Sequence, residues 1–214
     1  MLKKKRCVLL KLTVGKFFLN ICKMLKILGD INFSDGFFDM GFGVGSAIKK
    51  GFDPFVKLYR KKTDFWIGNL ECVCADTSDK RGGYAKQFLI SPRDLVCVKH
   101  LDLYGVANNH VMQHGESAYR EMLWYLGDHG VQYVGSLERK STTFFHEGKK
   151  VGIMAFSQRP ENFSQRPLYW CLPEYVEIQS ELAKLADCDF RIVFVHWGNE
   201  FINYPYLDQK AFAR

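Results

Sequence analysis

Apolar and polar positions divide the chain into short apolar runs and segments with helical spacing. The apolar runs predict strands at 23–32, 64–71, 101–110, 131–134, 141–146, 150–156 and 189–198. Helical spacing predicts helices at 54–61, 116–129 and 174–187, and Ser91-Pro92 is predicted to open a further short helix. Residues 33–47, rich in glycine and phenylalanine, are predicted to form a loop. Strands that alternate with helices in this way indicate an α/β protein.

Four of the predicted strands end in side chains that can bind a metal ion or carry a proton. They are Asp30 after the first strand, Asn69 and Glu71 after the second, Asn109 and His110 after the third, and His196 and Glu200 after the last. In open α/β sheets, sites form beyond the carboxyl ends of the strands. We therefore expect these side chains to converge, although they lie far apart in the sequence.

The composition is that of a folded globular protein, with 47% hydrophobic and 25% charged residues. These proportions exclude disordered, collagen-like and coiled-coil proteins. A length of 214 residues suits one large domain, or at most two small ones.

The net charge of +7 comes from the beginning of the chain. Residues 1–26 contain eight lysines and arginines and no acidic residue, which leaves 22 basic and 23 acidic residues in the rest. A nucleic-acid-binding domain spreads basic residues over a folded face. The balanced charge after residue 26 therefore argues against nucleic acid as a partner.

Residues 1–23 allow two readings. They could form a basic amphipathic segment that rests on an anionic membrane surface, or an extension that is not part of the fold, and the second reading is favoured because Met24 directly precedes the first strand. There is no clear signal peptide and no apolar run long enough to span a membrane. We expect a cytoplasmic protein or one at the cytoplasmic face of the membrane.

The seven cysteines are scattered and odd in number, which indicates a reducing compartment. Cys72 and Cys74 have no second cluster of cysteine or histidine nearby, so a structural zinc site is not expected.

The residues at the strand ends form a ligand set of carboxylates, an amide oxygen and imidazoles. Such a set suits Mn²⁺, Fe or Zn²⁺. If Glu71 bridges two ions about 3.5–4 Å apart, the site could assist an in-line displacement at phosphorus. A neighbouring histidine could then protonate the departing oxygen.

Four segments, in this order and spacing, resemble the bacterial capsule-synthesis family CapA. They are "GDIN" (29–32), "GNLE" (68–71), "ANNH" (107–110) and "HWGNEFINYPYLDQKAFA" (196–213). The family includes the poly-γ-glutamate capsule component, and its fold is akin to that of calcineurin-like metallophosphoesterases. The resemblance implies a four-layer sandwich of two mixed β-sheets flanked by helices, formed by residues 24–214.

The resemblance also implies roles for individual residues. Asp30, Glu71, Asn109 and His196 match metal ligands, with Glu71 as the bridging carboxylate, and His110 matches a proton-donating histidine. Asn69, Asn108 and Glu200 are further expected site residues, and the role of Glu200 is unassigned. By analogy, the partners are a phosphoester or polymer substrate and the capsule-synthesis machinery.

Three departures from the family pattern bear on the metal site. Asn32 stands where the phosphoesterase motif has a histidine, and Gln113 stands where the family often has an aspartate. The family continues into a Gly-His-His-Pro-His segment, whereas this chain ends at Arg214. We therefore expect the domain to be incomplete at its C-terminus.

Each candidate also has a purely structural reading. Asp30 could cap a turn, Asn69 and Glu71 could close a loop, and His196 could be a core histidine. His100, His114, His129 and His146 lack the context of a strand end and are predicted to lie on the surface. Two functions remain open: a metal-dependent phosphoesterase-like hydrolase, and a non-catalytic component that organises a polymer-synthesis complex at the membrane.

Overall fold

The computed structural model describes residues 23–36, 41–58, 60–96, 101–199, 202 and 204–213. The predicted extension at residues 1–23 lies outside this part of the chain, apart from Lys23. No helix in the described residues is long and apolar enough to cross a membrane.

The first sheet has four strands in the order β1-β2-β5-β6. These strands span Leu25–Ile31, Phe65–Leu70, Leu103–Gly105 and Gln132–Val134, and every neighbouring pair is parallel. Helix α3 (Glu116–Asp128) connects β5 to β6. Parallel neighbours need such a crossover, and their carboxyl ends then meet at one edge of the sheet.

The second sheet has the order β7-β8-β9, from Ser141–His146, Lys149–Ser157 and Phe190–His196. β7 and β8 are antiparallel, whereas β8 and β9 are parallel and joined through helix α4 (Tyr175–Lys184). A small parallel sheet pairs β3 (Val73–Cys74) with β4 (Leu89–Ile90).

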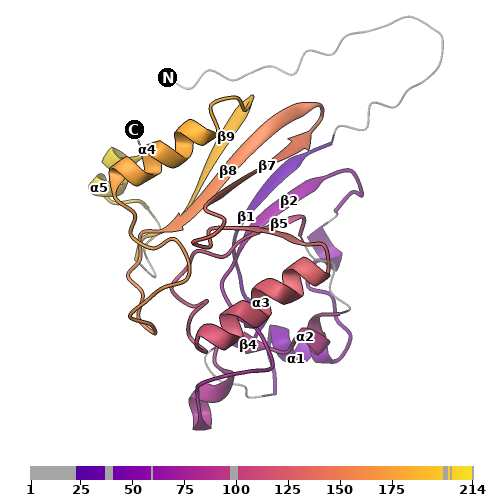
Figure 1. The fold of residues 1–214 in the computed structure, drawn as a ribbon. Coiled ribbons are helices and arrows are strands. Elements are labelled where there is room, and N and C mark those ends of the chain that lie inside the picture. Colours follow the sequence, from indigo (N-terminus) through magenta and orange to yellow (C-terminus); the bar gives the residue numbers. More distant parts are fainter. Residues whose placement is uncertain are drawn as a thin grey trace, which may run out of the picture.

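Three apolar clusters hold these elements in four layers. The first packs α3 against the first sheet, through residues such as Tyr104, Met122 and Leu126. The second lies between the two sheets, with Ile67 and Ile153 among its members, and the third packs α4 on the outer face of the second sheet. Figure 1 shows α4 along β9, and α3 with α1 and α2 in another part of the molecule. The predicted α/β class and sandwich architecture are confirmed.

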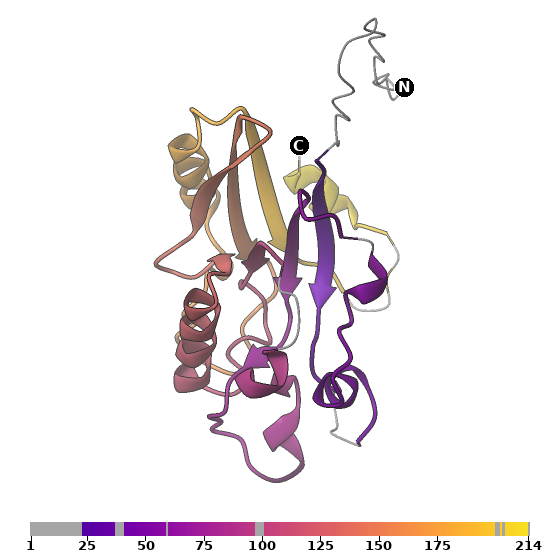
Figure 2. The same ribbon diagram turned by 90° about the vertical axis from the view of Figure 1, so that its right-hand side faces the viewer.

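Figure 2 gives the same ribbon in a view turned by 90°. In it the strands of the two sheets run in the upper half of the molecule, and the loops after the first sheet's parallel strands extend below them.

One predicted loop contains a helix. Residues 33–47 were expected to lack regular structure, but α1 spans Val44–Lys49. The carboxylate of Asp35 accepts hydrogen bonds from the backbone N–H of Ser46, at 2.7 Å, and from its hydroxyl. Asp35, eleven residues upstream, thus accepts from an N–H in the first helical turn that has no partner within the helix. The local spacing of apolar residues does not predict this contact.

The predicted helix at 54–61 is wrong. Only a three-residue 3₁₀ turn forms there, at Val56–Leu58. The Asp53 carboxylate accepts a hydrogen bond from the N–H of Phe55 at 2.9 Å and closes a turn. Val56 is 65% exposed and Leu58 40%, so these two residues contribute no buried apolar stripe that would sustain a longer helix.

The remaining short elements complete the description. They are the 3₁₀ helix at Gly82–Lys86, α2 at Pro92–Leu95, capped by Ser91 as predicted, and α5 at Leu207–Phe212. Cys72, Cys74 and Cys188 are buried and Cys171 is half-buried, all as free thiols.

Glu181 provides a test of how α4 is held on the second sheet. Its carboxylate accepts hydrogen bonds from Ser141 of β7 and from Lys184. Burial raises the pKa of Glu181, but these bonds outweigh burial and hold the pKa below its ordinary value of 4.5. The ionised carboxylate therefore stabilises the fold above pH 4.5, and this contribution is lost as the pH falls through the lowered pKa.

We expect Glu181→Gln to lower the free energy of unfolding by about 1 kcal/mol at neutral pH. The difference from the parent should shrink near pH 3. Urea unfolding at both pH values measures it, with Glu138→Gln on the surface as control. A difference that does not change with pH would show that the ionised carboxylate is not what holds α4.

Candidate metal centre

The candidate site lies between the two sheets, at the carboxyl ends of their parallel strands. Successive side chains in a strand point to opposite faces, and Ile67 of β2 faces the second sheet. Asn69, two residues later, therefore points to the same side. On β9, Ile192 and Phe194 face the first sheet, and His196 continues this series. The alternation thus turns Asn69 and His196 toward each other.

Asp30 joins them through an irregularity in β1. Ile27 pairs with Ile67, but Asp30 pairs with Asn69, so β1 advances three residues while β2 advances two. One extra residue in a strand reverses the face of everything beyond it. Without this bulge, Asp30 would point toward the α3 side of the sheet. With it, the carboxylate lies on the side of His196.

His196 is the centre of the cluster. Its Nδ1 lies 3.3 Å from Oδ1 of Asp30 and 3.2 Å from Nδ2 of Asn69. Its Nε2 lies 2.9 Å from Oδ1 of Asn109 and 3.6 Å from Oε1 of Glu71. Both ring nitrogens therefore face oxygen atoms that could share a cation with them.

The donor set fits a divalent metal ion. One ligand atom from each of Asp30, Glu71 and His196 lies within 4.8 Å of the other two, and the carbonyl oxygen of Asn109 adjoins the same imidazole. Carboxylate, amide and imidazole donors are those that Mn²⁺, Fe and Zn²⁺ accept. His196 is almost buried and Asp30 is half-exposed, so one side of the cluster is open to solvent.

A chain of buried amides supports the cluster. Nδ2 of Asn69 donates to Oδ1 of Asp30 at 2.6 Å, and Oδ1 of Asn69 accepts from Nδ2 of Asn108 at 3.1 Å. Asn108 also donates to the carbonyl of Leu70 at 2.8 Å and accepts from the N–H of His110 at 3.1 Å. Because each amide has a donor on one side and an acceptor on the other, the network fixes both amide orientations.

Charge and hydrogen bonding both act on the carboxylate of Asp30. Partial burial raises its pKa, but hydrogen bonds with His196 and Asn69 and the charge of nearby imidazoles outweigh burial. The pKa of Asp30 therefore lies below its ordinary value. The carboxylate is ionised at neutral pH, as a metal ligand must be.

His110 follows the amide chain and is held on two sides. Its Nδ1 lies 2.9 Å from Oε1 of Gln113, whose Nε2 donates to Oε1 of Gln87 at 3.0 Å. The ring of Phe88 stacks on the imidazole, with centroids 4.0 Å apart and an interplanar angle of 10°. Gln113 presents its oxygen to this nitrogen, so Nδ1 of His110 carries a proton.

The structure brings together most of the predicted site residues. His196 lies beside all of Asp30, Asn69, Glu71 and Asn109. Asn108 adjoins this group through Asn69, and His110 through Asn108. Glu200 lies outside the described residues. The contributions of Gln87 and Phe88 were not anticipated, because both come from a loop with no motif of its own.

One histidine prediction is wrong. His114 was expected on the surface but is fully buried. Its ring nitrogens contact the hydroxyl of Ser78 at 2.7 Å and the carbonyl of Gln87, and burial lowers its pKa. It fastens the loop that carries Gln87 to the start of α3. His129 is exposed and His146 is half-buried, while His100 lies outside the described residues.

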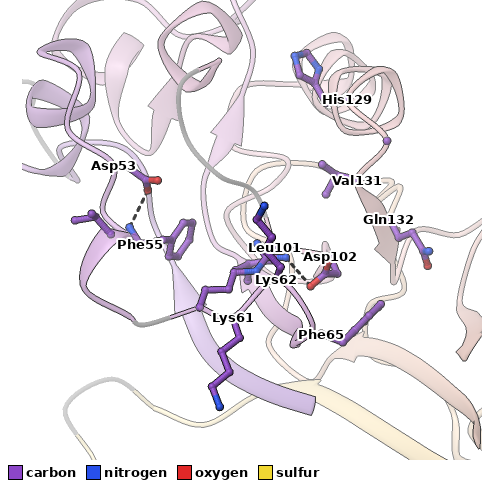
Figure 3. A pocket seen from close by; sticks show the side chains of 13 residues that line it. Asp53, Phe55, Lys61, Lys62, Phe65, Leu101, Asp102, His129, Val131 and Gln132 are labelled. Carbon is purple, nitrogen blue, oxygen red and sulfur yellow. Dashed lines mark hydrogen bonds and ion pairs between the residues drawn. The ribbon is translucent and has the colours of Figure 1, made fainter. Parts of the chain in front are cut away.

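Two cavities lie at opposite ends of the first sheet. One of about 180 Å³ adjoins the cluster and is lined by Asp30, Asn69, His196 and Trp197, among others. A larger one of about 870 Å³ lies at the amino ends of β2, β5 and β6 (Figure 3) and contains none of the predicted site residues. There Arg60 pairs with Asp102 at 2.7 Å, and the Asp102 carboxylate also accepts from the N–H of Trp66.

Comparisons with known proteins give a family match and a similar solved structure. The model of the family described as "Bacterial capsule synthesis protein PGA_cap" matches residues 24–214. Among solved structures, a protein named as a 5'-nucleotidase from Staphylococcus aureus, in complex with alpha-ketoglutarate, is similar with a TM-score of 0.46 and 15% identity. The match covers 81% of this chain and 37% of that one, so this chain spans little more than a third of its length. No curated protein matches.

The buried amides should contribute to stability independently of any metal ion. Asn69→Ala removes one hydrogen bond from Asp30 and one from Asn108, and the loss of two such bonds costs about 1–3 kcal/mol. We expect a loss of this size in urea unfolding of the metal-free protein. Asn162→Ala, at an exposed position, is the control, and an equally small effect of both substitutions would contradict the network.

Proposed function

The chain belongs to the bacterial capsule synthesis family, and from this we propose that it is a metal-dependent hydrolase acting on a phosphoester in the production of a capsule or exopolysaccharide of the poly-γ-glutamate type. The observation that carries the proposal is the cluster of Asp30, Glu71 and His196, with ligand atoms within 4.8 Å of one another. Four separate strand ends supply this cluster and Asn109, which a merely structural role would not require.

Each residue has a distinct part in the proposed reaction. Asp30, Glu71, Asn109 and His196 would hold a divalent ion, Mn²⁺, Fe or Zn²⁺, and Glu71 would be shared if a second ion binds. When bound, the metal supplies Lewis-acid polarisation of a phosphoryl oxygen. Asn69 and Asn108 keep the ligands oriented through their hydrogen bonds, as residues behind metal ligands commonly do.

His110 is the proposed general acid. The bond from Nδ1 to Gln113 fixes the ring, and the stacked Phe88 fixes its plane. In its protonated form Nε2 can deliver a proton to the departing oxygen. Gln113 offers a neutral oxygen, which stabilises an imidazolium less than a carboxylate would. Gln113 therefore serves to orient His110.

We extend the proposal to the setting of the reaction. The proposed substrate is a phosphoester or the polymer itself, and the proposed partner is the capsule-synthesis machinery. Residues 1–23 would bring the domain to the cytoplasmic face of the membrane through their basic side chains.

A non-catalytic role in assembling the synthesis complex is the second candidate. The observation in its favour is Asn32, at the position of a histidine in the phosphoesterase motif. Its Oδ1 accepts hydrogen bonds from the N–H and the hydroxyl of Ser34, at 2.8 and 2.7 Å. The side chain is thus engaged in a local turn, and one part of the family's ligand set is missing from the site.

Metal content separates the two candidates. We expect the purified chain to bind Mn²⁺, Fe or Zn²⁺ stoichiometrically, and the double variant Asp30→Ala/His196→Ala to lose the ion. Elemental analysis and calorimetric titration measure this. The matched control is Asp128→Ala/His146→Ala, which changes the same residue types outside the cluster. Absence of metal in a folded parent chain would refute the hydrolase and leave the assembly role.

The role of His110 can be tested with two leaving groups. We expect His110→Asn to retain the metal and to reduce turnover of phenyl phosphate about a hundredfold or more. The reduction should be smaller for p-nitrophenyl phosphate, whose leaving group needs little protonation. Equal losses with both substrates would contradict a general-acid role. His146→Asn is the control and should leave both rates unchanged.

A further inference from the structure

A further hollow, separate from the two cavities described above, lies at the carboxyl ends of β8 and β9, next to the candidate metal centre. It has a volume of about 510 Å³, which is within the usual range for a small-molecule site. Its walls come from residues 158–160 after β8, residues 197–199 after β9, and α5 with the preceding Tyr206. We propose that this hollow binds a pyranose unit of a carbohydrate, as a substrate subsite. The proposal rests on the proposed function and narrows its polymer to an exopolysaccharide in place of poly-γ-glutamate.

Aromatic rings form one wall of the hollow. Trp197 and Phe212 meet edge to face, with centroids 5.9 Å apart and an interplanar angle of 71°. The ring of Phe212 also packs against that of the buried Phe156, with centroids 6.1 Å apart. This contact fixes the aromatic wall to the core. Tyr206 and Phe212 keep 40% and 37% of their surface exposed. Fixed aromatic faces of this kind suit the C–H face of a sugar ring.

Polar side chains surround the rings. Gln158, Asn199, Asp208 and Gln209 line the same hollow. Asn199 donates from Nδ2 to the hydroxyl of Tyr206 at 3.2 Å, and Gln209 accepts from the N–H of Tyr206 at 2.8 Å. These bonds leave the carbonyl oxygen of Asn199 and the Nε2 group of Gln209 for a ligand. Amides offer both donors and acceptors, as the hydroxyl groups of a sugar require.

The charges of the hollow favour a neutral ligand over a polyanion. Arg159 is the cation of its lining and Asp208 the anion, and Arg159 donates from Nη1 to the carbonyl of Gly198 at 3.0 Å. A polycarboxylate would meet Asp208 without an excess of positive charge to offset the repulsion. Sugar hydroxyls instead can donate to this carboxylate.

The hollow shares lining residues with two neighbouring hollows. Trp197 also lines the 180 Å³ cavity that contains Asp30 and His196. The other neighbouring hollow has a volume of about 400 Å³ and is also lined by Trp197, Asn199 and Tyr206. Tyr204, in the same lining, is 71% exposed. These neighbouring hollows around Trp197 suit successive sugar units of a polysaccharide, with one end of the polysaccharide beside the candidate metal centre.

Saturation-transfer NMR on the full, metal-free chain tests the proposal. The probes are methyl β-glucopyranoside, methyl α-galactopyranoside and N-acetylglucosamine at millimolar concentration. We expect transfer to the ring protons of at least one probe, weakened about tenfold in Trp197→Ala. Gln158→Ala should also weaken it, and because its side chain is partly exposed, this variant should fold normally. Trp124→Ala, at an exposed position of α3, should have no effect.

Two results would overturn the inference. One is the absence of transfer to all three probes. The other is binding of poly-γ-glutamate in place of the sugars, with the same dependence on Trp197. The outcome is independent of the metal centre, because the measurement needs no metal. Sugar binding without metal binding would refute the proposed hydrolase alone, whereas metal binding without sugar binding would refute this subsite alone.

Discussion

The packing of the second sheet on the first is the constraint on which the candidate centre depends. His196 belongs to the second sheet, whereas Asp30 and Asn69 belong to the first sheet and Glu71 directly follows its strand β2. The cluster therefore exists only while the two sheets are in contact. Phe65 and Phe144 stack across this interface with centroids 4.1 Å apart. Near the site, a Cβ on Gly105 would lie 2.9 Å from the ring of Phe194. Glycine at this position therefore allows β9 to approach closely enough for His196 to reach its partners.

Burying two consecutive polar side chains needs a physical reason. Asn108 is fully buried and Asn109 nearly so, and unpaired amides in such positions would be costly. Each is paired here: Asn108 with Asn69 and Leu70, and Asn109 with His196. The amides therefore fix the positions of the side chains that meet between the sheets, at a place where apolar residues would pack more easily. Their arrangement favours a rigid site over a simple core.

Much of this arrangement could be predicted from the sequence. The predicted strands are present, with Asp30, Asn69 and His196 at or near their ends, but β5 is shorter than predicted and Asn109 lies in the loop that follows Gly105. The rule that sites form at carboxyl ends explains why these residues meet. The bulge in β1 could not be predicted, because it depends on pairing with β2. The same is true of α1, which Asp35 caps from a distance, and of the burial of His114, which depends on Ser78 and Gln87. These features depend on contacts with residues far away in the sequence, and the local spacing of apolar and polar residues does not predict them.

The two ends of the first sheet show why volume alone does not identify a site. The 870 Å³ cavity at the amino ends is the larger, yet the Asp102 carboxylate in it already accepts from Arg60 and from the backbone N–H of Trp66. These bonds tie the start of β2 to the residue before β5. At the carboxyl ends the polar groups also contact one another, but Asp30 is half-exposed and both nitrogens of His196 face oxygen atoms. The smaller hollow therefore has the chemistry of a site, because its donors converge on a space that solvent can reach.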